Sequence, residues 1–166
     1  MYSHKKCFYA TLFCCAILST TGFVSAQNST SETTPPKSSD SASGVTYFDA
    51  AQVNASFAKG VAVLFAGTED GDYKIMTASR TTPGMAELHG LYTDVIYVIQ
   101  GTATVVTGGK VVDGKTTEPN EIRGTGIQNG ESRKLAKGDV IIIPKGTPHQ
   151  FTDPTGPFLY YVVKVK

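Results

Sequence analysis

The stretch "AELHGLYTDVIYVIQG", residues 86–101, places polar side chains directly before an almost wholly apolar run that stops at a glycine. Glu87 and His89 are two residues apart, and Asp94 follows five residues after His89. Residues two apart on a β-strand point to the same face, so Glu87 and His89 are expected to project together. A turn over 90–93 would let Asp94 open the next strand beside His89. The stretch therefore predicts three possible metal-ligand side chains on two adjoining strands.

A second stretch, "GDVIIIPKGTPHQFTD", residues 138–153, contains the only other histidine after residue 26. Its prolines and glycines at 144, 146 and 148 indicate a strand, a tight turn and a new strand that begins near His149. His149 is therefore a fourth candidate ligand, from a part of the chain far from the first three.

The two stretches together resemble the two motifs of the cupin superfamily. The second motif has a glycine, a proline, a glycine and a histidine at fixed spacing, and all four are present: Gly138, Pro144, Gly146 and His149. In the first motif the spacing is kept and two ligand types differ. Glu87 stands at the first histidine position, His89 at the second, Asp94 at the glutamate position and Gly101 at the glycine.

This resemblance covers residues 75–165 and implies a single-domain, all-β jelly-roll barrel with its metal site inside. The side chains of Glu87, His89, Asp94 and His149 would then point into the barrel. The pattern of the residues agrees with this, because after Gly60 short runs rich in Val, Ile, Tyr, Phe and Thr alternate with turn residues. Residues 108–131 are polar and Gly-rich, and we expect a loop or loose hairpin at the rim.

One short helix is expected before the barrel. Asp49 can cap its start, Gln52 lies three residues later as in a capping box, and Gly60 would end it.

The N-terminal 26 residues have the order of a secretory signal peptide: Lys5 and Lys6, a short apolar stretch, then Val24–Ser25–Ala26. An uncleaved anchor is the alternative. Residues 27–44 are rich in Ser, Thr and Pro and predict a disordered tether, which leaves 45–166 as the barrel domain. We therefore expect a secreted or periplasmic protein with no membrane span after signal cleavage.

Charge excludes some partners. Without Lys5 and Lys6, 13 basic residues face 14 acidic ones, so the formal net charge falls from +1 to −1. The charged residues are spread along the chain, which gives no basic patch for nucleic acid or an anionic membrane. The three cysteines all lie within residues 1–26, so the barrel has no thiolate ligand and no disulfide.

The candidate ligands are nitrogen and oxygen donors, a set that suits a divalent metal ion such as Fe(II), Mn(II), Zn(II) or Ni(II). The carboxylates favour the harder ions Fe(II) and Mn(II). Two carboxylates and two imidazoles inside an apolar barrel are costly to bury without compensation, which an ion would supply. The alternative is a water-filled pocket in which the same groups bind one another.

Three functions stay open at this point. One is a small metal-dependent enzyme of oxygenase, isomerase or lyase type that acts on a small, oxygen-rich organic substrate. The others are a non-catalytic periplasmic or extracellular protein that binds a small ligand, and a metal-free structural dimer. Strands that are apolar on both faces suggest a homodimer.

Four further residues are candidates for substrate contacts. Tyr92, near the ligands, and Tyr161, on the last strand, could transfer protons or orient a substrate, although either ring could simply pack. Arg80 and Arg123 could bind a substrate carboxylate, or could be solvated surface residues.

Overall fold

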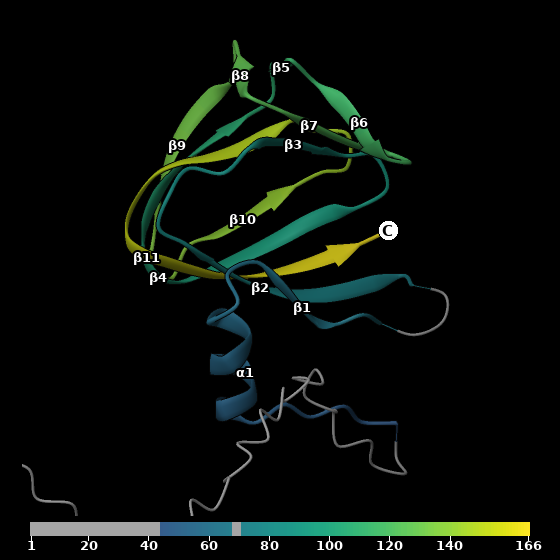
Figure 1. Ribbon diagram of the computed structural model, residues 1–166, viewed down its shortest axis with the longest axis vertical. Coiled ribbons are helices and arrows are strands. Elements are labelled where there is room, and N and C mark those ends of the chain that lie inside the picture. The colour runs from purple at the N-terminus through teal and green to yellow at the C-terminus, as the bar shows by residue number, and fades with distance from the viewer. Residues whose placement is uncertain (1–43, 68–70) are drawn as a thin grey trace, which may run out of the picture. The chain divides into compact units, whose positions relative to one another are not determined.

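The structure is a computed structural model that describes residues 44–67 and 71–166 (Figure 1). The predicted signal peptide and, apart from Gly44, the predicted tether lie outside the described residues. Strands make up most of the described chain, as an all-β fold requires, and a single helix precedes them. No helix in the described part is both long enough and apolar enough to span a membrane.

The helix α1 (Ala50–Phe57) begins as the sequence predicts. The Asp49 carboxylate accepts a hydrogen bond from the Gln52 backbone N–H at 2.8 Å, and the Gln52 side chain accepts one from the Asp49 N–H at 2.9 Å. This capping box satisfies N–H groups that the first helical turn leaves unpaired. The Phe57 ring lies 5.4 Å from the Tyr161 ring, which places α1 against the outer face of the barrel.

The strands run in chain order as follows: β1 (Ala62–Phe65), β2 (Tyr73–Arg80), β3 (Ala86–His89), β4 (Thr93–Thr107), β5 (Lys110–Val112), β6 (Lys115–Glu118), β7 (Glu121–Gly124), β8 (Gly126–Gln128), β9 (Glu131–Ala136), β10 (Val140–Ile143) and β11 (His149–Val165). All pairings are antiparallel. The main sheet has the order β1-β2-β11-β3-β7-β6, with β4 also paired to β11, and β5 pairs with β8 separately.

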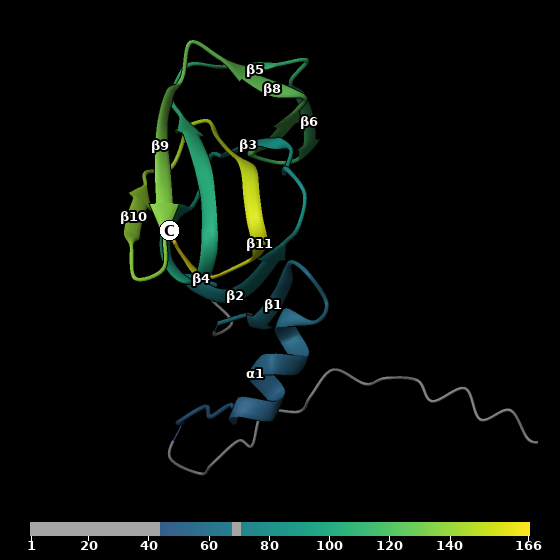
Figure 2. The ribbon, with the colours of Figure 1, turned by 90° about the vertical axis from the view of Figure 1, so that its left-hand side faces the viewer.

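The two longest strands, β4 and β11, form the frame of the barrel. They pair along nearly their whole length, and β9 and β10 follow one another along the other edge of β4 (Figure 2). Both strands bend sharply midway. Gly101 has φ +77°, and a Cβ there would lie 2.7 Å from the Pro157 carbonyl oxygen, so only glycine fits at the bend.

Alternate residues of β4 and β11 point inward and form the core. On β4 the buried residues before the bend are Asp94, Ile96 and Val98, and on β11 after its bend they include Phe158, Tyr160 and Val162. This two-residue period is the one expected of strands with one covered face. It also sends Tyr161 outward, toward α1.

The segment 108–131 differs from the loop or loose hairpin that its composition predicts. It forms four short strands, β5 to β8. Asp113 and Asn120, in the turns after β5 and β6, and Asn129, in the turn from β8 to β9, adopt positive φ. Asn and Asp tolerate that conformation better than other non-glycine residues, so a polar sequence can still reverse direction abruptly. β7 pairs with β3, which places Arg123 opposite Glu87 and Glu121 opposite His89.

Candidate metal centre

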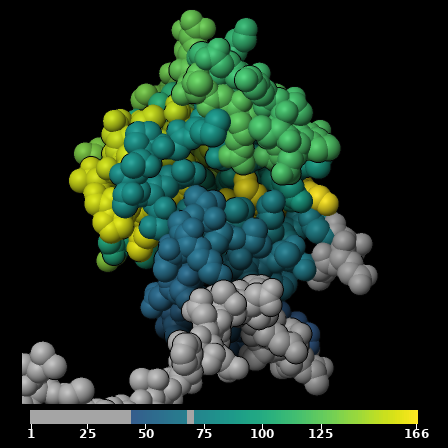
Figure 3. All heavy atoms as spheres, in the orientation of Figure 1, coloured from purple at the N-terminus to yellow at the C-terminus, as the bar shows by residue number. Residues whose placement is uncertain are grey.

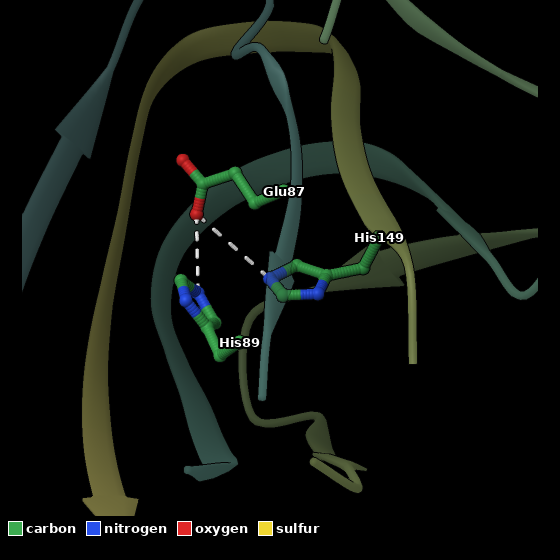
Figure 4. A group of neighbouring side chains, drawn as sticks. All are labelled: Glu87, His89 and His149. Atoms are coloured by element: carbon green, nitrogen blue, oxygen red, sulfur yellow. Dashed lines mark ion pairs between the residues drawn. The ribbon is translucent and has the colours of Figure 1, made fainter. Parts of the chain in front are cut away.

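Three of the predicted ligands meet at one point inside the barrel (Figure 4). Glu87 and His89 project together from β3, as their spacing predicts, and His149 opens β11 directly opposite Glu87 in the strand register. One ligand atom from each lies within 4.8 Å of the others. Glu87 Oε2 lies 3.4 Å from His89 Nε2 and 3.9 Å from His149 Nε2. The geometry therefore offers a carboxylate and two imidazoles to one small cation.

Both imidazoles are held with Nε2 toward the others. His89 Nδ1 lies 2.5 Å from Glu121 Oε2, and His149 Nδ1 lies 3.2 Å from the Thr147 carbonyl oxygen. A carboxylate and a carbonyl accept hydrogen bonds, so each Nδ1 carries a proton. In the neutral form of either ring, Nε2 then presents its lone pair toward Glu87 Oε2. Among the described residues, His89 Nε2 is a buried nitrogen without a hydrogen-bond partner. A metal ion at this point would satisfy it, so the residues fit the predicted ion.

The neighbours of Glu87 stabilise the ionised form of its carboxylate. Burial raises its pKa, but contact with His89, the Arg123 charge and the two imidazoles lower it more, to about 2. Arg123 Nη1 contacts Glu87 Oε1, and Arg80 Nη2 lies 3.9 Å from the same oxygen. Burial also lowers the pKa of His149, which favours its neutral form. An ionised carboxylate and a neutral imidazole are the states that bind a metal.

Asp94, the fourth predicted ligand, lies beside the group but has another partner. Its Oδ2 is 3.7 Å from His89 Nε2 and 3.8 Å from His149 Nε2. Both of its oxygens accept hydrogen bonds from Lys164 Nζ, at 2.6 and 2.7 Å. Burial lowers the pKa of Lys164, and the Asp94 charge opposes that effect. Asp94 therefore neutralises a buried lysine, and the three-residue group stands without it.

The site opens into a cavity of about 700 Å³. Apolar side chains from β2, β4 and β11 form part of its wall: Met76, Ala78, Ile96, Phe151 and Val162. In Figure 3 the β6–β7 segment (green) and the α1–β1 segment (blue) lie on one face, with part of β11 (yellow) visible between them. Residues of β6, β7 and β11 line the cavity. Its volume is large enough for a small organic molecule.

The two tyrosine predictions have different outcomes. Tyr92 lines the cavity, where Lys74 Nζ lies 4.7 Å from the centre of its ring. Tyr161 does not line it, because its side chain packs against Phe57 on the outer face. Its neighbour Tyr160 points inward and its hydroxyl accepts a hydrogen bond from Arg80 Nε at 2.7 Å. The structure thus places Tyr160 at the cavity, whereas the sequence analysis had named Tyr161.

The cavity residues that the sequence reasoning missed include Glu121, Tyr160 and Lys164. Lys164 follows Tyr160 and Val162 at a spacing of two, so the alternation of β11 was a usable signal once one inward residue was known. The bulges between 152 and 160 prevent that count from starting at His149. Glu121 gave no signal, because its partner strand lies more than 30 residues earlier.

Comparison with known proteins gives a family and a fold. A family model described as "Cupin" matches residues 73–165. No curated protein sequence matches the chain. An uncharacterised conserved protein with a double-stranded β-helix domain from Klebsiella pneumoniae superposes with a TM-score of 0.51 at 17% identity, over 72% of this chain and 88% of that one.

Two other solved structures are more distant. A hydroquinone 1,2-dioxygenase from Sphingomonas sp. TTNP3 has a TM-score of 0.47 at 13% identity, over 64% of this chain and 65% of that one. A protein from Bacillus halodurans has a TM-score of 0.42 at 17% identity, over 56% and 61%. The chain thus covers less than two thirds of either protein, and the likeness concerns the fold alone.

Proposed function

The chain belongs to the cupin family, and from this membership and the geometry of the site we propose that it is a small metal-dependent enzyme. Glu87, His89 and His149 would hold one divalent ion. The substrate would be a small, oxygen-rich organic molecule bound in the adjoining cavity. The reaction would be of oxygenase, isomerase or lyase type.

The observation that carries this proposal is the state of the two imidazoles. Glu121 and the Thr147 carbonyl fix both Nδ1 atoms, and His89 Nε2 is buried without a hydrogen-bond partner among the described residues. A buried polar atom without a partner is costly unless something binds it. Two neutral imidazoles and one ionised carboxylate are a donor set typical of Fe(II) and Mn(II), with Zn(II) and Ni(II) as alternatives.

The chain's own groups suit a catalytic cavity. A bound ion would supply Lewis acidity or redox chemistry. The apolar wall of β2, β4 and β11 would exclude water from the reacting atoms, and Tyr160, whose pKa burial raises, would stay protonated beside Arg80. Tyr92 stands at the cavity as a candidate for orienting a substrate.

A second candidate is a metal-free protein that binds a small ligand. It is favoured by the charge pairing, because the three carboxylates nearest the imidazoles have cationic or imidazole partners without an ion: Glu87 with Arg123, Asp94 with Lys164, and Glu121 with His89. A purely structural role is less well supported, since that role needs no cavity of about 700 Å³.

Export and pairing of two copies complete the proposal. The N-terminal sequence pattern supports secretion to the periplasm or the exterior. Val140 and Ile142 of β10 are each 61% exposed, and Tyr97 beside Val140 is 48% exposed. An exposed apolar group on an outer sheet face supports a homodimer.

The test is elemental analysis of the purified chain from residue 27, with His149→Ala as the variant and Arg133→Gln as a matched surface control. We expect close to one equivalent of Fe or Mn per chain in the unmodified protein and in Arg133→Gln, and a loss of metal in His149→Ala. Circular dichroism checks that the variant folds. A chain that stays metal-free after incubation with Fe(II), Mn(II), Zn(II) and Ni(II) would exclude the metalloenzyme and leave the ligand-binding protein.

A further inference from the structure

The formal charges that line the cavity cancel. Among the residues that the structure describes, its cationic side chains are Lys74, Arg80, Arg123 and Lys164. The same described part of the chain contributes an equal number of acidic side chains: Glu87, Asp94, Glu118 and Glu121. The Asp94–Lys164 pair adds zero to the sum wherever its shared proton lies, so the balance does not depend on that proton. With both histidines neutral, the protein part of the cavity therefore has no net charge.

A divalent ion would break this balance. An imidazole that coordinates through Nε2 and keeps its proton on Nδ1 remains neutral, as the contacts of His89 and His149 require. The loaded cavity would then have two uncompensated positive charges in a partly apolar surrounding. Charge in such a surrounding attracts a counter-charge strongly, because little water screens it. The loaded site is therefore suited to an anion.

Two guanidinium groups lie where such an anion would bind. Arg80 and Arg123 both approach Glu87 Oε1, whereas Glu87 Oε2 faces the two imidazoles. Once Glu87 binds an ion, its single negative charge has to balance both that ion and the two guanidinium groups. A second carboxylate at this position would restore the balance. Guanidinium groups match a carboxylate in shape, since their planar N–H groups can donate to both of its oxygens.

Arg80 is the better placed of the two. Its side chain is 17% exposed, against 34% for Arg123. Of its five N–H donors, only Nε makes a hydrogen bond to another described residue, to the Tyr160 hydroxyl at 2.7 Å. That bond orients the guanidinium, and its Nη2 lies 3.9 Å from Glu87 Oε1. Phe151, whose ring centre lies 5.8 Å from Arg80 Cζ, adds an apolar surface beside it.

From these contacts we propose that the ligand of the site is a small organic acid, with its carboxylate held by Arg80 and, nearer the mouth, by Arg123. The inference rests on the proposed metal centre and names the substrate class for it. The apolar wall accepts the carbon part of the acid, and binding depends on the ion, because only the loaded cavity has excess positive charge.

The experiment uses glycolate and its neutral analogue glycolamide as probes, which differ by one charge at nearly equal size. Each is titrated by calorimetry into Co(II)-loaded and metal-free protein, and the visible Co(II) spectrum reports changes near the ion. We expect glycolate to bind the loaded protein at least about tenfold more tightly than glycolamide, and to bind the metal-free protein no better than glycolamide. Arg80→Gln should weaken glycolate binding about tenfold and leave Co(II) affinity within about threefold.

Arg133→Gln is the matched control, since it removes a guanidinium of the same charge outside the cavity and should bind glycolate as the unmodified chain does. Arg80→Lys, which keeps the charge, covers the case in which Arg80→Gln does not fold, and it should still weaken glycolate binding. Equal binding of glycolate and glycolamide, or full glycolate affinity in both Arg80 variants, would overturn this inference and leave the metal centre standing. Failure to bind Co(II) at all would overturn both.

Discussion

Two parts of the same barrel interior follow opposite rules. The packed region, formed by Val98, Ala103, Val105, Leu135 and Phe158, is apolar and at most 3% exposed. The cavity region around the metal centre is almost as well buried, with His89, His149 and Asp94 at 3–4%, yet it consists largely of charged and polar groups. β4 and β11 contribute inward-facing residues to both regions.

The difference shows that burial alone does not tell what stabilises a position. In the packed region, side chains fill volume; the Phe158 ring, for example, has its centre 5.7 Å from that of Phe151 at the neighbouring cavity wall. In the cavity region, each buried charge relies on a specific partner, and the energy of a substitution depends on whether a partner is left alone. Substitutions that remove one partner or both therefore separate the two regions.

The largest effect is expected for Lys164→Met, a change that keeps an unbranched side chain of similar length. In a region governed by volume it would be nearly harmless. In the cavity region it leaves Asp94, which is 3% exposed, as an unpaired buried charge, so we expect a loss of about 3 kcal/mol in the free energy of unfolding. Urea unfolding measures it.

The matched variant for this prediction is the double substitution Lys164→Met with Asp94→Asn, which removes both charges. It should recover most of the lost stability, because no buried charge is left alone. If the single and double variants are equally unstable, side-chain packing and not charge pairing governs this part of the cavity.

The second prediction concerns acid. The folded pKa of Glu87 is about 2, below its ordinary value of 4.5, so the stability it contributes is complete above 4.5 and is lost as the pH falls toward 2. In that window the slope reaches at most about 1.4 kcal/mol per pH unit. Glu87→Gln should therefore show a flatter fall in unfolding free energy between pH 5 and pH 3 than the unmodified chain.

Glu131→Gln is the control for this measurement, because Glu131 is an exposed carboxylate whose partner Arg133 is also exposed. Its pH profile should follow that of the unmodified chain, since exposed ion pairs contribute little. Identical profiles for Glu87→Gln and Glu131→Gln would show that the network around Glu87 does not stabilise the folded state.

The smallest effect is expected for Glu121→Gln. Glu121 is not one of the three proposed ligands. It would act through His89, whose Nδ1 lies 2.5 Å from the Glu121 carboxylate. Loss of such an outer carboxylate lowers metal affinity by about tenfold. Calorimetric titration with Co(II) measures the affinity, and nitrogen chemical shifts of His89 show whether its proton has left Nδ1.

Glu118→Gln is the comparison for Glu121, since it also lines the cavity and changes the charge equally. Its Co(II) affinity should change less, and the His89 shifts should stay unaltered. An equal loss in both variants would mean that Glu121 acts only through its charge and does not position His89.

Local sequence could predict the parts of the site whose partners are close in the chain or set by a motif. Glu87 and His89 share a strand face because they are two residues apart, and the turn before His149 is written in its prolines and glycines. The family resemblance supplied the remaining prediction, that residues 86–101 and 138–153 come together in the barrel.

The remaining site residues depended on pairings that no local pattern contains. The segment 108–131 reads as a loop because its residues are polar, but β7 is stabilised by hydrogen bonds to β3, which its composition does not reveal. The bulges of β11 shift its register, so that Tyr160 and not Tyr161 faces the cavity.

The sequence by itself determined the barrel class, the capping of α1 and the residues able to bind an ion, because strand alternation, turn chemistry and side-chain donors are local properties. Only the tertiary structure decided that Lys164 neutralises Asp94, that Glu121 fixes the His89 proton and that two arginines share Glu87. These are distances between strands far apart in the chain. Electrostatic energy depends on such distances and on burial, and neither is set until the barrel has formed.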